Sequence, residues 1–272
     1  MRQVYKSLFL NFNMASYDVF GNIAVVKFPK TFSNLQKKKY ASDFLKKHQS
    51  VKTIVEKSDR IKGRLRTMKL KYLAGERNLE CLYKENGCIF RLNVGSCYFS
   101  PRLASERKEL AEMIKKDERV LVMFGGVAPY AVVFGKYSKA SEIISVELGR
   151  ECSKYALENV KRNKLVERVK IFQGDVRKVI GKGKKVEGYF DRIVMARPNL
   201  KDSFLDIAFK VIRANGIIHY YGFYDESKID ELKELIQKEA IRAKKKIKIL
   251  RIKKAGDIGV RVWRWRVDFL VY

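Results

Sequence analysis

The chain has 272 residues, 46% of them hydrophobic, which is enough for a sizeable core in one large domain or in two. Its 59 Lys and Arg residues outnumber 30 Asp and Glu residues, and the resulting formal charge of +29 is spread along the chain. This excess favours a polyanion, nucleic acid first, as the partner. A Lys-rich thermophile surface is the alternative, but such a surface normally carries matching Glu.

Membrane insertion, secretion and metal binding are disfavoured. The chain has neither an apolar run of membrane-spanning length nor a signal-peptide pattern, so we expect a soluble cytoplasmic protein. The cysteines have no CxxC spacing, and both histidines lie far from them in the sequence; the cysteines are Cys81, Cys88, Cys97 and Cys152. We therefore expect no metal site, and reduced, mostly buried thiols. A disulfide between two of the first three stays open for a hyperthermophilic source.

The first third of the chain predicts a small α+β domain. Residues 1–15 form a basic lead that suits an edge strand, and residues 17–28 predict two strands around a Gly-Asn turn. A helix is expected over 35–47, capped by Ser33. Short β-like runs follow at 51–56, 69–73, 79–84 and 88–94. We place the domain boundary after residue 96, with domains of 1–96 and 97–272 that pack rigidly because no Pro/Ser-rich linker separates them.

A helix, an apolar strand and a glycine-rich turn follow. The helix is predicted from the phase of its apolar residues between Leu103 and Ile114, with Lys115 and Lys116 at its end. The strand covers 119–123, and the turn after it contains Phe124, Gly125, Gly126, Val127 and Pro129. Small residues directly after a buried strand allow close approach of the backbone to a ligand. An ordinary tight connection is the alternative, because the turn is not a full GxGxxG.

The next three strands end in residues that suit a nucleoside. A strand over 138–147 ends at Glu147, roughly 20 residues after the turn, where such folds place a carboxylate on a ribose diol. After a helix over 152–163, a strand over 169–173 leads to Asp175, which can accept from an exocyclic amine such as that of adenine. The strand over 189–195 is followed by Ala196, Arg197, Pro198 and Asn199. Ligands of open α/β sheets bind outside these strand ends.

The C-terminal elements complete a mixed sheet. A helix is predicted over 204–213, a strand over 216–221, a basic amphipathic helix over 226–244 and a strand over 246–252. The closing run VRVWRWRVDFLVY alternates too strictly for a helix and predicts a final antiparallel strand, with Arg264 and Arg266 on one side and Trp263 and Trp265 on the other. Such a strand is structural or, through Arg and Trp together, contacts nucleic acid.

The motifs YFSPRLASER, MFGGVAPY, VEL, GDVR and IIHYYGF together resemble the archaeal and eukaryotic family of tRNA guanosine-37 N1-methyltransferases, from Ser16 onward. The resemblance implies a Rossmann-like class I methyltransferase domain after the small α+β domain. It implies S-adenosyl-L-methionine as cofactor, tRNA as partner, and methyl transfer to N1 of guanosine 37. We expect the small leading domain of many members to be missing, so recognition would centre on the anticodon arm, and we expect a monomer.

The resemblance also assigns residues. Methylation removes the N1 proton while charge gathers on O6, so a base and a cation are needed. The motif implies Glu106 as the base and Arg66 near O6, with Arg102 in or beside the same pocket and Pro198 retained after the fourth strand. The implied cofactor contacts are Tyr98, Arg107, Phe124, Gly125, Gly126, Val127, Pro129, Glu147, Leu148, Asp175 and Val176.

Two departures from the family pattern leave alternatives open. Val122 stands where the family often has an acid, and Ala196 stands where an asparagine is thought to orient the guanine. A pocket without that asparagine suits a bulkier base, so methylation of the tricyclic wyosine precursor 4-demethylwyosine at C7 is a second hypothesis. The alternatives are aminocarboxypropyl transfer in the wyosine pathway and a noncatalytic RNA-binding protein on a methyltransferase fold.

Overall fold

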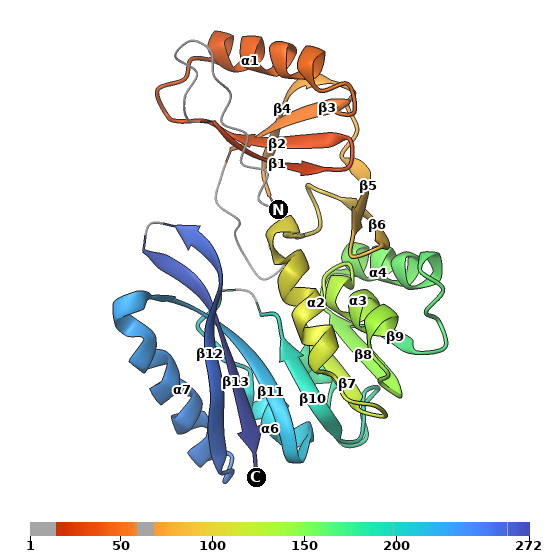
Figure 1. The fold of residues 1–272 in the computed structure, drawn as a ribbon, viewed down its shortest axis with the longest axis vertical. Helices are drawn as coiled ribbons and strands as arrows, with labels where there is room; N and C mark the ends of the chain where they lie inside the picture. The colour runs from red at the N-terminus through yellow and green to blue at the C-terminus, as the bar shows by residue number, and fades with distance from the viewer. Residues whose placement is uncertain (1–14, 59–67, 198, 260) are drawn as a thin grey trace.

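A seven-stranded sheet forms the larger part of the molecule (Figure 1). The computed structural model describes residues 15–58, 68–197, 199–259 and 261–272. The strand order is β12-β13-β11-β10-β7-β8-β9. In chain order the strands are β7 (Arg119–Met123), β8 (Glu142–Glu147), β9 (Val169–Gln173), β10 (Phe190–Met195), β11 (Ile212–Asp225), β12 (Ile247–Gly259) and β13 (Val262–Val271).

The sheet is parallel from β11 to β9 and antiparallel at its other edge. β7 pairs in parallel with β8 and β10, and β9 and β11 extend the parallel part. β13 runs antiparallel to both β11 and β12, so the predicted antiparallel final strand is confirmed. Because all parallel strands point the same way, the loops after β7, β8, β9 and β10 meet at one edge.

Helices cover both faces of this sheet, which explains why its central strands are continuously apolar. On β7, Val120 and Val122 belong to one core cluster, while Leu121 and Met123 belong to the other. The first cluster lies against α2 (Ala104–Met113), α3 (Pro129–Tyr137) and α4 (Arg150–Arg162). The second lies against α5 (Val176–Val179), α6 (Leu205–Val211) and α7 (Ile229–Arg242). The predicted fold class is confirmed.

A smaller unit precedes this domain. Its four-stranded sheet contains β1 (Ser16–Phe20), β2 (Ile23–Lys27), β3 (Thr53–Lys57) and β4 (Leu70–Gly75). Helix α1 (Asn34–Lys47) packs on it, and Ser33 forms the predicted cap as a capping box with Gln36. A hairpin of β5 (Glu80–Glu85) and β6 (Cys88–Asn93) connects this unit to the helices of the large sheet (Figure 1).

The two parts share a hydrophobic core. Phe20 of β1 contacts Tyr83 of β5 and Phe99, with ring centroids 6.2 and 6.4 Å away, and the same cluster continues to Val120 in the large sheet. Burial of these apolar rings stabilises the arrangement of the parts. The division after residue 96 stays a prediction.

Several predicted boundaries differ from the structure. Helix α6 ends at Val211, and β11 starts at Ile212, which pairs with Phe190. The tertiary pairing of the strand therefore overrides the local helical pattern. β8 begins at Glu142 rather than at residue 138. α2 ends at Met113, before the two lysines that were predicted to lie at its end. Residues 226–228, predicted as the start of a long helix, form the 3₁₀ helix η2 (Glu226–Lys228) before α7. A second 3₁₀ helix, η1 (Pro101–Leu103), precedes α2.

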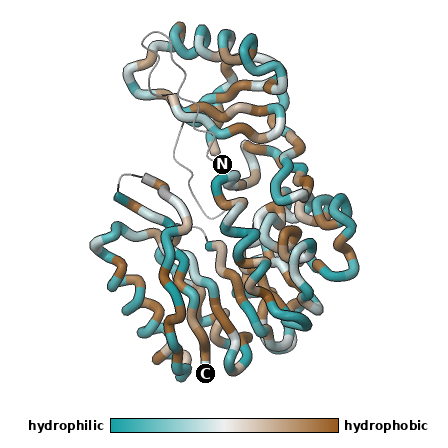
Figure 2. The backbone as a smooth tube through the Cα atoms, viewed as in Figure 1, coloured by the Kyte–Doolittle hydropathy of each residue, from teal (hydrophilic) through white to brown (hydrophobic). Residues whose placement is uncertain are grey.

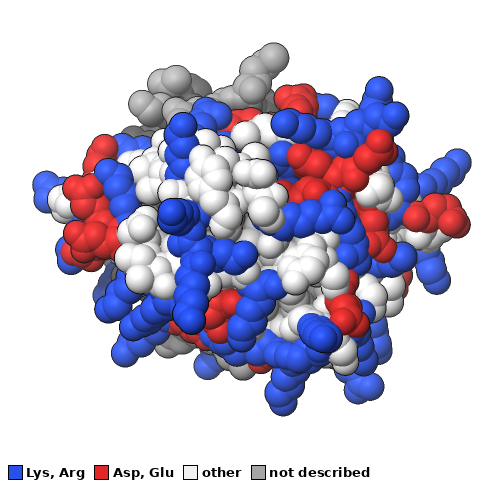
Figure 3. Space-filling model, turned by 90° about the horizontal axis from the view of Figure 1, so that it is seen from below, with Lys and Arg blue, Asp and Glu red and all other residues white. Residues whose placement is uncertain are grey.

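The surface is strongly basic. Apolar residues gather along the central strands, whereas α1 and α7 carry hydrophilic outer faces (Figure 2). Lys and Arg are spread over the face that Figure 3 presents, with smaller groups of Asp and Glu between them. Within the described ranges, no helix has both the length and the apolar character needed to cross a membrane.

Candidate functional site

A pocket lies at the carboxyl ends of the parallel strands. Its wall includes residues directly after β7, β8, β9 and β10, the segment before α2, and one residue of β13. The predicted cofactor residues that line it are Tyr98, Arg107, Phe124, Gly125, Gly126, Pro129, Glu147, Leu148, Asp175 and Val176. Val127 is fully buried behind the turn, where its carbonyl accepts a hydrogen bond from Asn159.

The glycine-rich turn brings backbone to the pocket in an unusual conformation. Phe124 and Ala128 have φ of 64° and 65°, and Gly126 has φ of 58°. Left-handed backbone at non-glycine residues costs free energy and is typical of functional turns. A Cβ on Gly125 would lie 2.0 Å from Ser145 Oγ, so only glycine fits there. The amides of the turn hold it together: that of Gly126 donates to the Glu147 carboxylate, and that of Ala128 donates to the carbonyl of Gly125.

Glu147 is a half-buried carboxylate at the end of β8. It accepts hydrogen bonds from the amide of Gly126 at 2.8 Å and from the amide of Gly149 at 2.6 Å. Burial raises the pKa of Glu147, and the backbone donors oppose this effect. The side chain is held rigidly by the turn, and its remaining acceptor capacity suits the two hydroxyls of a ribose.

Asp175 is fixed after β9 in a similar way. Its carboxylate caps α5 by accepting from the amide of Arg177 at 2.9 Å. The preceding Gly174 has φ of 151°, and a Cβ there would lie 2.5 Å from a methyl of Val179. Asp175 and Glu147 are the acidic residues of the pocket wall.

Glu106 lies behind the wall rather than in it. The residue is 5% exposed and lies in the first turn of α2, but it does not line the pocket. Its Oε1 accepts from Tyr221 Oη at 2.8 Å and from Arg266 Nη1 at 2.6 Å. Lys253 Nζ lies 3.2 Å from Oε2. Tyr221 does line the pocket, so it separates Glu106 from the pocket interior.

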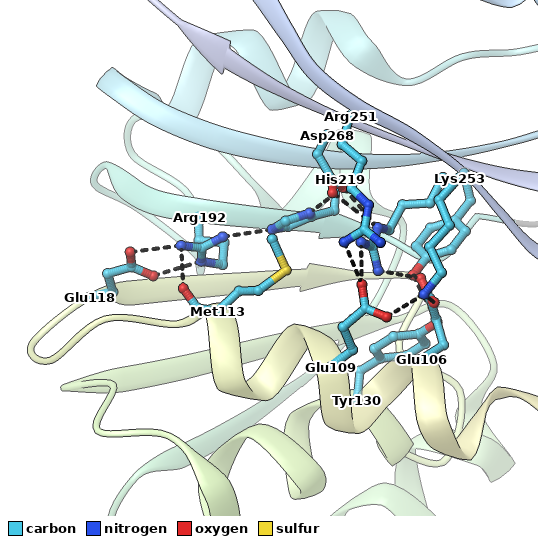
Figure 4. Close-up of polar contacts among 12 residues, drawn as sticks. Glu106, Glu109, Met113, Glu118, Tyr130, Arg192, His219, Arg251, Lys253 and Asp268 are labelled. Carbon is cyan, nitrogen blue, oxygen red and sulfur yellow. Dashed lines mark hydrogen bonds and ion pairs between the residues drawn. The ribbon is translucent and has the colours of Figure 1, made fainter.

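A buried charge cluster continues from Glu106 along α2. Figure 4 shows it as a row of side chains between this helix and the strands above it. Arg266 also bonds Glu109 and Asp268, and Lys253 bonds Glu109. The row continues through His219 and Arg192 to Glu118.

The geometry of His219 fixes its tautomer. Its Nε2 lies 2.7 Å from Arg192 Nη1, which can only donate, so Nε2 accepts. The ring proton is then on Nδ1 and is donated to Asp268 Oδ1 at 2.6 Å. Burial lowers the pKa of His219, although Asp268 opposes this, so the ring is neutral.

The other predicted residues are distributed differently. Arg107 lines the pocket, but its guanidinium is held by both carboxylate oxygens of the buried Glu85. Arg102 pairs with Asp18 of β1 at 3.1 Å, its side chain is 56% exposed, and it is not part of the pocket wall. Arg66 and Pro198 lie outside the described residues. Ala196 does line the pocket.

Sequence reasoning missed Tyr130, Tyr221 and Arg264, which all line the pocket. The strand alternation places Arg264 and Arg266 on one side of β13, but it does not reveal that this side is buried. Both arginines and Trp265 are in fact less than 9% exposed, so this part of the strand is interior. In the described segments, no group of three or more His, Cys, Asp or Glu is placed to hold a metal ion.

Comparison with known proteins points to one family. Residues 81–250 match the model of the TRM5/TYW2 methyltransferase domain, and residues 10–78 match that of the TYW2 N-terminal domain. The chain is 31% identical to the tRNA (guanine(37)-N(1))-methyltransferase Trm5b of Pyrococcus abyssi, over 94% of this chain and 74% of that protein. It is 33% identical to the tRNA (guanine(37)-N(1))/4-demethylwyosine(37)-methyltransferase Taw22 of Nanoarchaeum equitans, over 93% of this chain and 98% of that protein.

Solved structures of members of the same family are similar to this chain. The crystal structure of Pyrococcus abyssi Trm5b superposes with a TM-score of 0.82 at 32% identity, over 94% of this chain and 74% of that chain. The complex of aTrm5 with tRNALeu superposes with a TM-score of 0.83 at 25% identity, over 94% of this chain and 72% of that chain. Both the small N-terminal unit and the large sheet therefore have counterparts in known structures.

Proposed function

The chain belongs to the TRM5/TYW2 methyltransferase family, and from this premise we propose that it transfers the methyl group of S-adenosylmethionine to N1 of guanosine 37 in tRNA. The observation that carries the proposal is the convergence of the glycine-rich turn, Glu147 and Asp175 on one pocket. Cytoplasmic location and a monomeric state remain predictions.

The pocket fits the cofactor. A Cβ is excluded at Gly125, and the half-buried Glu147 and Asp175 are fixed by backbone donors at the ends of neighbouring strands. We assign Glu147 to the ribose hydroxyls and Asp175 to the adenine amine. When bound, S-adenosylmethionine supplies an electrophilic methyl group on a sulfonium. The role of the protein is then to orient the target base and to accept its proton.

Glu106 accepts the N1 proton in this proposal. It is held as an acceptor by Arg266 and Lys253, and its neighbour Tyr221 lines the pocket. The route from the pocket to Glu106 therefore passes the Tyr221 hydroxyl, which donates to Glu106 and accepts from Tyr130 at 3.3 Å. A hydroxyl has two acceptor lone pairs, so it can accept the N1 proton while it passes its own proton to Glu106.

Substrate binding rests on the basic surface and on two further arginines. The charge of +29 suits the tRNA backbone, whose phosphates supply sequence-independent affinity. We assign Arg66 to O6 of the guanine and the exposed Arg102 of η1, which pairs with Asp18 of β1, to the RNA beside it. The base must leave the anticodon stack to reach the pocket.

Methyl transfer from labelled S-adenosylmethionine to tRNA transcripts tests the activity. Transcripts with guanosine at position 37 should be methylated at N1, and transcripts with adenosine there should not. Glu106→Gln should lower the single-turnover rate by about 10²- to 10⁴-fold, the usual contribution of a general base. Glu109→Gln is the matched control, because Glu109 lies one turn further along α2 and bonds the same Arg266 and Lys253. Equal rates for both variants would contradict the role of Glu106.

A second pair of variants tests the proton route. Tyr221→Phe should slow methyl transfer by about 10- to 100-fold and leave cofactor affinity unchanged, because the ring stays in place and only the hydroxyl is lost. Tyr220→Phe is the control, since the Tyr220 hydroxyl is buried without a hydrogen-bond partner in the described chain. A Tyr221→Phe enzyme as fast as the Tyr220→Phe enzyme would show that Glu106 acts without the tyrosine.

Methylation of 4-demethylwyosine at C7 is a second candidate activity. It is favoured by Ala196, whose small side chain lines the pocket beside the end of β10. The family relative Taw22 is named for both activities. tRNA that carries 4-demethylwyosine at position 37 is the substrate to test, with mass spectrometry of the nucleoside product. A mass increase of one methyl supports the second activity, a larger increase indicates aminocarboxypropyl transfer, and no change excludes both.

A further inference from the structure

Among the described residues, three arginines line the pocket, and one of them, Arg107, has an acidic partner there. Arg107 is neutralised by Glu85. Arg197 donates to the backbone carbonyls of Leu200 and Asp202. Arg264 donates to Tyr98 Oη at 2.9 Å and lies over the ring of Phe223. No carboxylate of the described chain forms an ion pair with Arg197 or Arg264, although the two residues are 5% and 7% exposed.

A buried cation without an anion is unfavourable, and a ligand anion is the natural partner where such a cation lines a pocket. The guanidinium of Arg264 is also pre-oriented by its two neighbours. Its bond to Tyr98 fixes one edge, and the aromatic face of Phe223 fixes the plane. A planar donor held in this way suits a carboxylate, which it can bind through two hydrogen bonds.

The sheet order places Arg264 opposite the acidic residues of the pocket. Glu147 ends β8 and Asp175 follows β9, whereas Arg264 is on β13, which is separated from β8 by β11, β10 and β7. Arg264 is nevertheless connected to the glycine-rich turn, because the carbonyl oxygen of its partner Tyr98 lies 3.5 Å from the Cβ position of Gly126. The pocket is thus acidic at one end and basic at the other.

We propose that Arg264 binds the carboxylate of the methionine part of S-adenosylmethionine. The inference rests on the proposed function, because it takes the adenosine of this cofactor to lie at Glu147 and Asp175. The cofactor has its carboxylate at the end remote from adenine, and the two acidic residues would repel that group from their own end of the pocket. Arg264 completes the charge complementarity and holds the methionine chain in one orientation.

Calorimetric titration separates this role from catalysis. Wild type, Arg264→Met and Arg264→Gln are titrated with S-adenosylhomocysteine and with 5′-methylthioadenosine, which lacks the amino acid part. Loss of Arg264 should weaken S-adenosylhomocysteine binding roughly 10- to 100-fold, the effect of one charge-assisted hydrogen-bonded pair, and change 5′-methylthioadenosine binding less than about twofold. Arg264→Gln keeps a hydrogen-bond donor for Tyr98, so the two ligand affinities can be measured on this variant if Arg264→Met does not fold.

Arg197→Met is the matched control from the same pocket, and it should weaken both ligands equally or not at all. Equal losses for the two ligands in both Arg264 variants would overturn the proposal, because Arg264 would then only shape the wall. Unchanged S-adenosylhomocysteine affinity with weaker tRNA binding would also overturn it and would assign Arg264 to the RNA. Wild-type protein that binds both ligands but leaves tRNA unmethylated would contradict the proposed activity and leave the carboxylate assignment standing.

Discussion

The two halves of the seven-stranded sheet build the site by different means. The parallel half, β7 to β10, contributes glycines and two acids at the strand ends, Glu147 and Asp175, which accept hydrogen bonds from backbone amides. The antiparallel half, β11 to β13, contributes long side chains that cross the interior to α2, among them Arg266 and Lys253. The contacts proposed for adenosine thus depend on local backbone geometry, whereas the surroundings of Glu106 depend on Lys253 and Arg266, 147 and 160 positions away in the sequence.

This difference predicts that the antiparallel half is the more sensitive to loss of charge. Arg266→Met should lower the free energy of unfolding by about 3–5 kcal/mol, because Arg266 is fully buried and bonds Glu106, Glu109 and Asp268. Arg251→Met is the control: Arg251 also bonds Glu109, but its side chain is 51% exposed, so the loss should stay within about 1 kcal/mol. Urea unfolding measures both, and similar losses would contradict the comparison.

The parallel half should be sensitive to added volume instead. Gly125→Ala should destabilise the fold by about 1–3 kcal/mol and weaken S-adenosylhomocysteine binding, because the new methyl would lie 2.0 Å from Ser145 Oγ. Adding Ser145→Ala removes that oxygen and leaves Ser145 Cβ at 3.4 Å, an ordinary contact, so the double variant should recover stability. A double variant no more stable than Gly125→Ala would mean that the clash is not the cause.

The smallest effect concerns pH. In the folded state burial lowers the pKa of His219 below its ordinary value of 6.5. Below about pH 6.5 the unfolded chain therefore binds a proton at this residue that the folded chain does not. As the pH is lowered through this range, the free energy of unfolding should therefore decrease, by up to about 1.4 kcal/mol per pH unit from this residue.

His219→Gln should reduce that slope when urea unfolding is measured between pH 5 and pH 8. The same substitution at the exposed His48 is the control. If the free energy of unfolding depends on pH equally in wild type and in His219→Gln, then His219 binds its proton equally in the folded and unfolded states. The conclusion that its ring is neutral in the folded state would then be wrong.

The difference between the parallel and antiparallel halves also explains how much of the fold and of the site could be predicted from the sequence. The glycine-rich turn, Glu147 and Asp175 each directly follow an apolar strand, so local pattern is enough to place them at one edge of a parallel sheet. The pattern also predicts the antiparallel direction of β13. The helix expected over 204–213 was cut short because β11 begins at Ile212, a pairing that no local window contains.

The charged interior could not be predicted from the sequence. Alternation puts Arg264 and Arg266 on one side of β13, but it does not show that this side is buried or that acids from another element neutralise Arg266 there. Those acids are Glu106 and Glu109 of α2, and only the folded chain brings them to Arg266. The position of Tyr221 between Glu106 and the pocket is likewise set by the packing of β11 against α2 and α3.

The three aromatic rings shared by the two parts have a mechanical consequence. Phe20 belongs to the N-terminal sheet, Tyr83 to the hairpin, and Phe99 to the pocket wall itself. Side chains in such contact resist compression and pass displacement on rather than absorb it. A displacement of the N-terminal sheet is therefore transmitted through Phe20 to the segment that carries Tyr98. The small unit and this wall of the pocket are thus coupled in their movement.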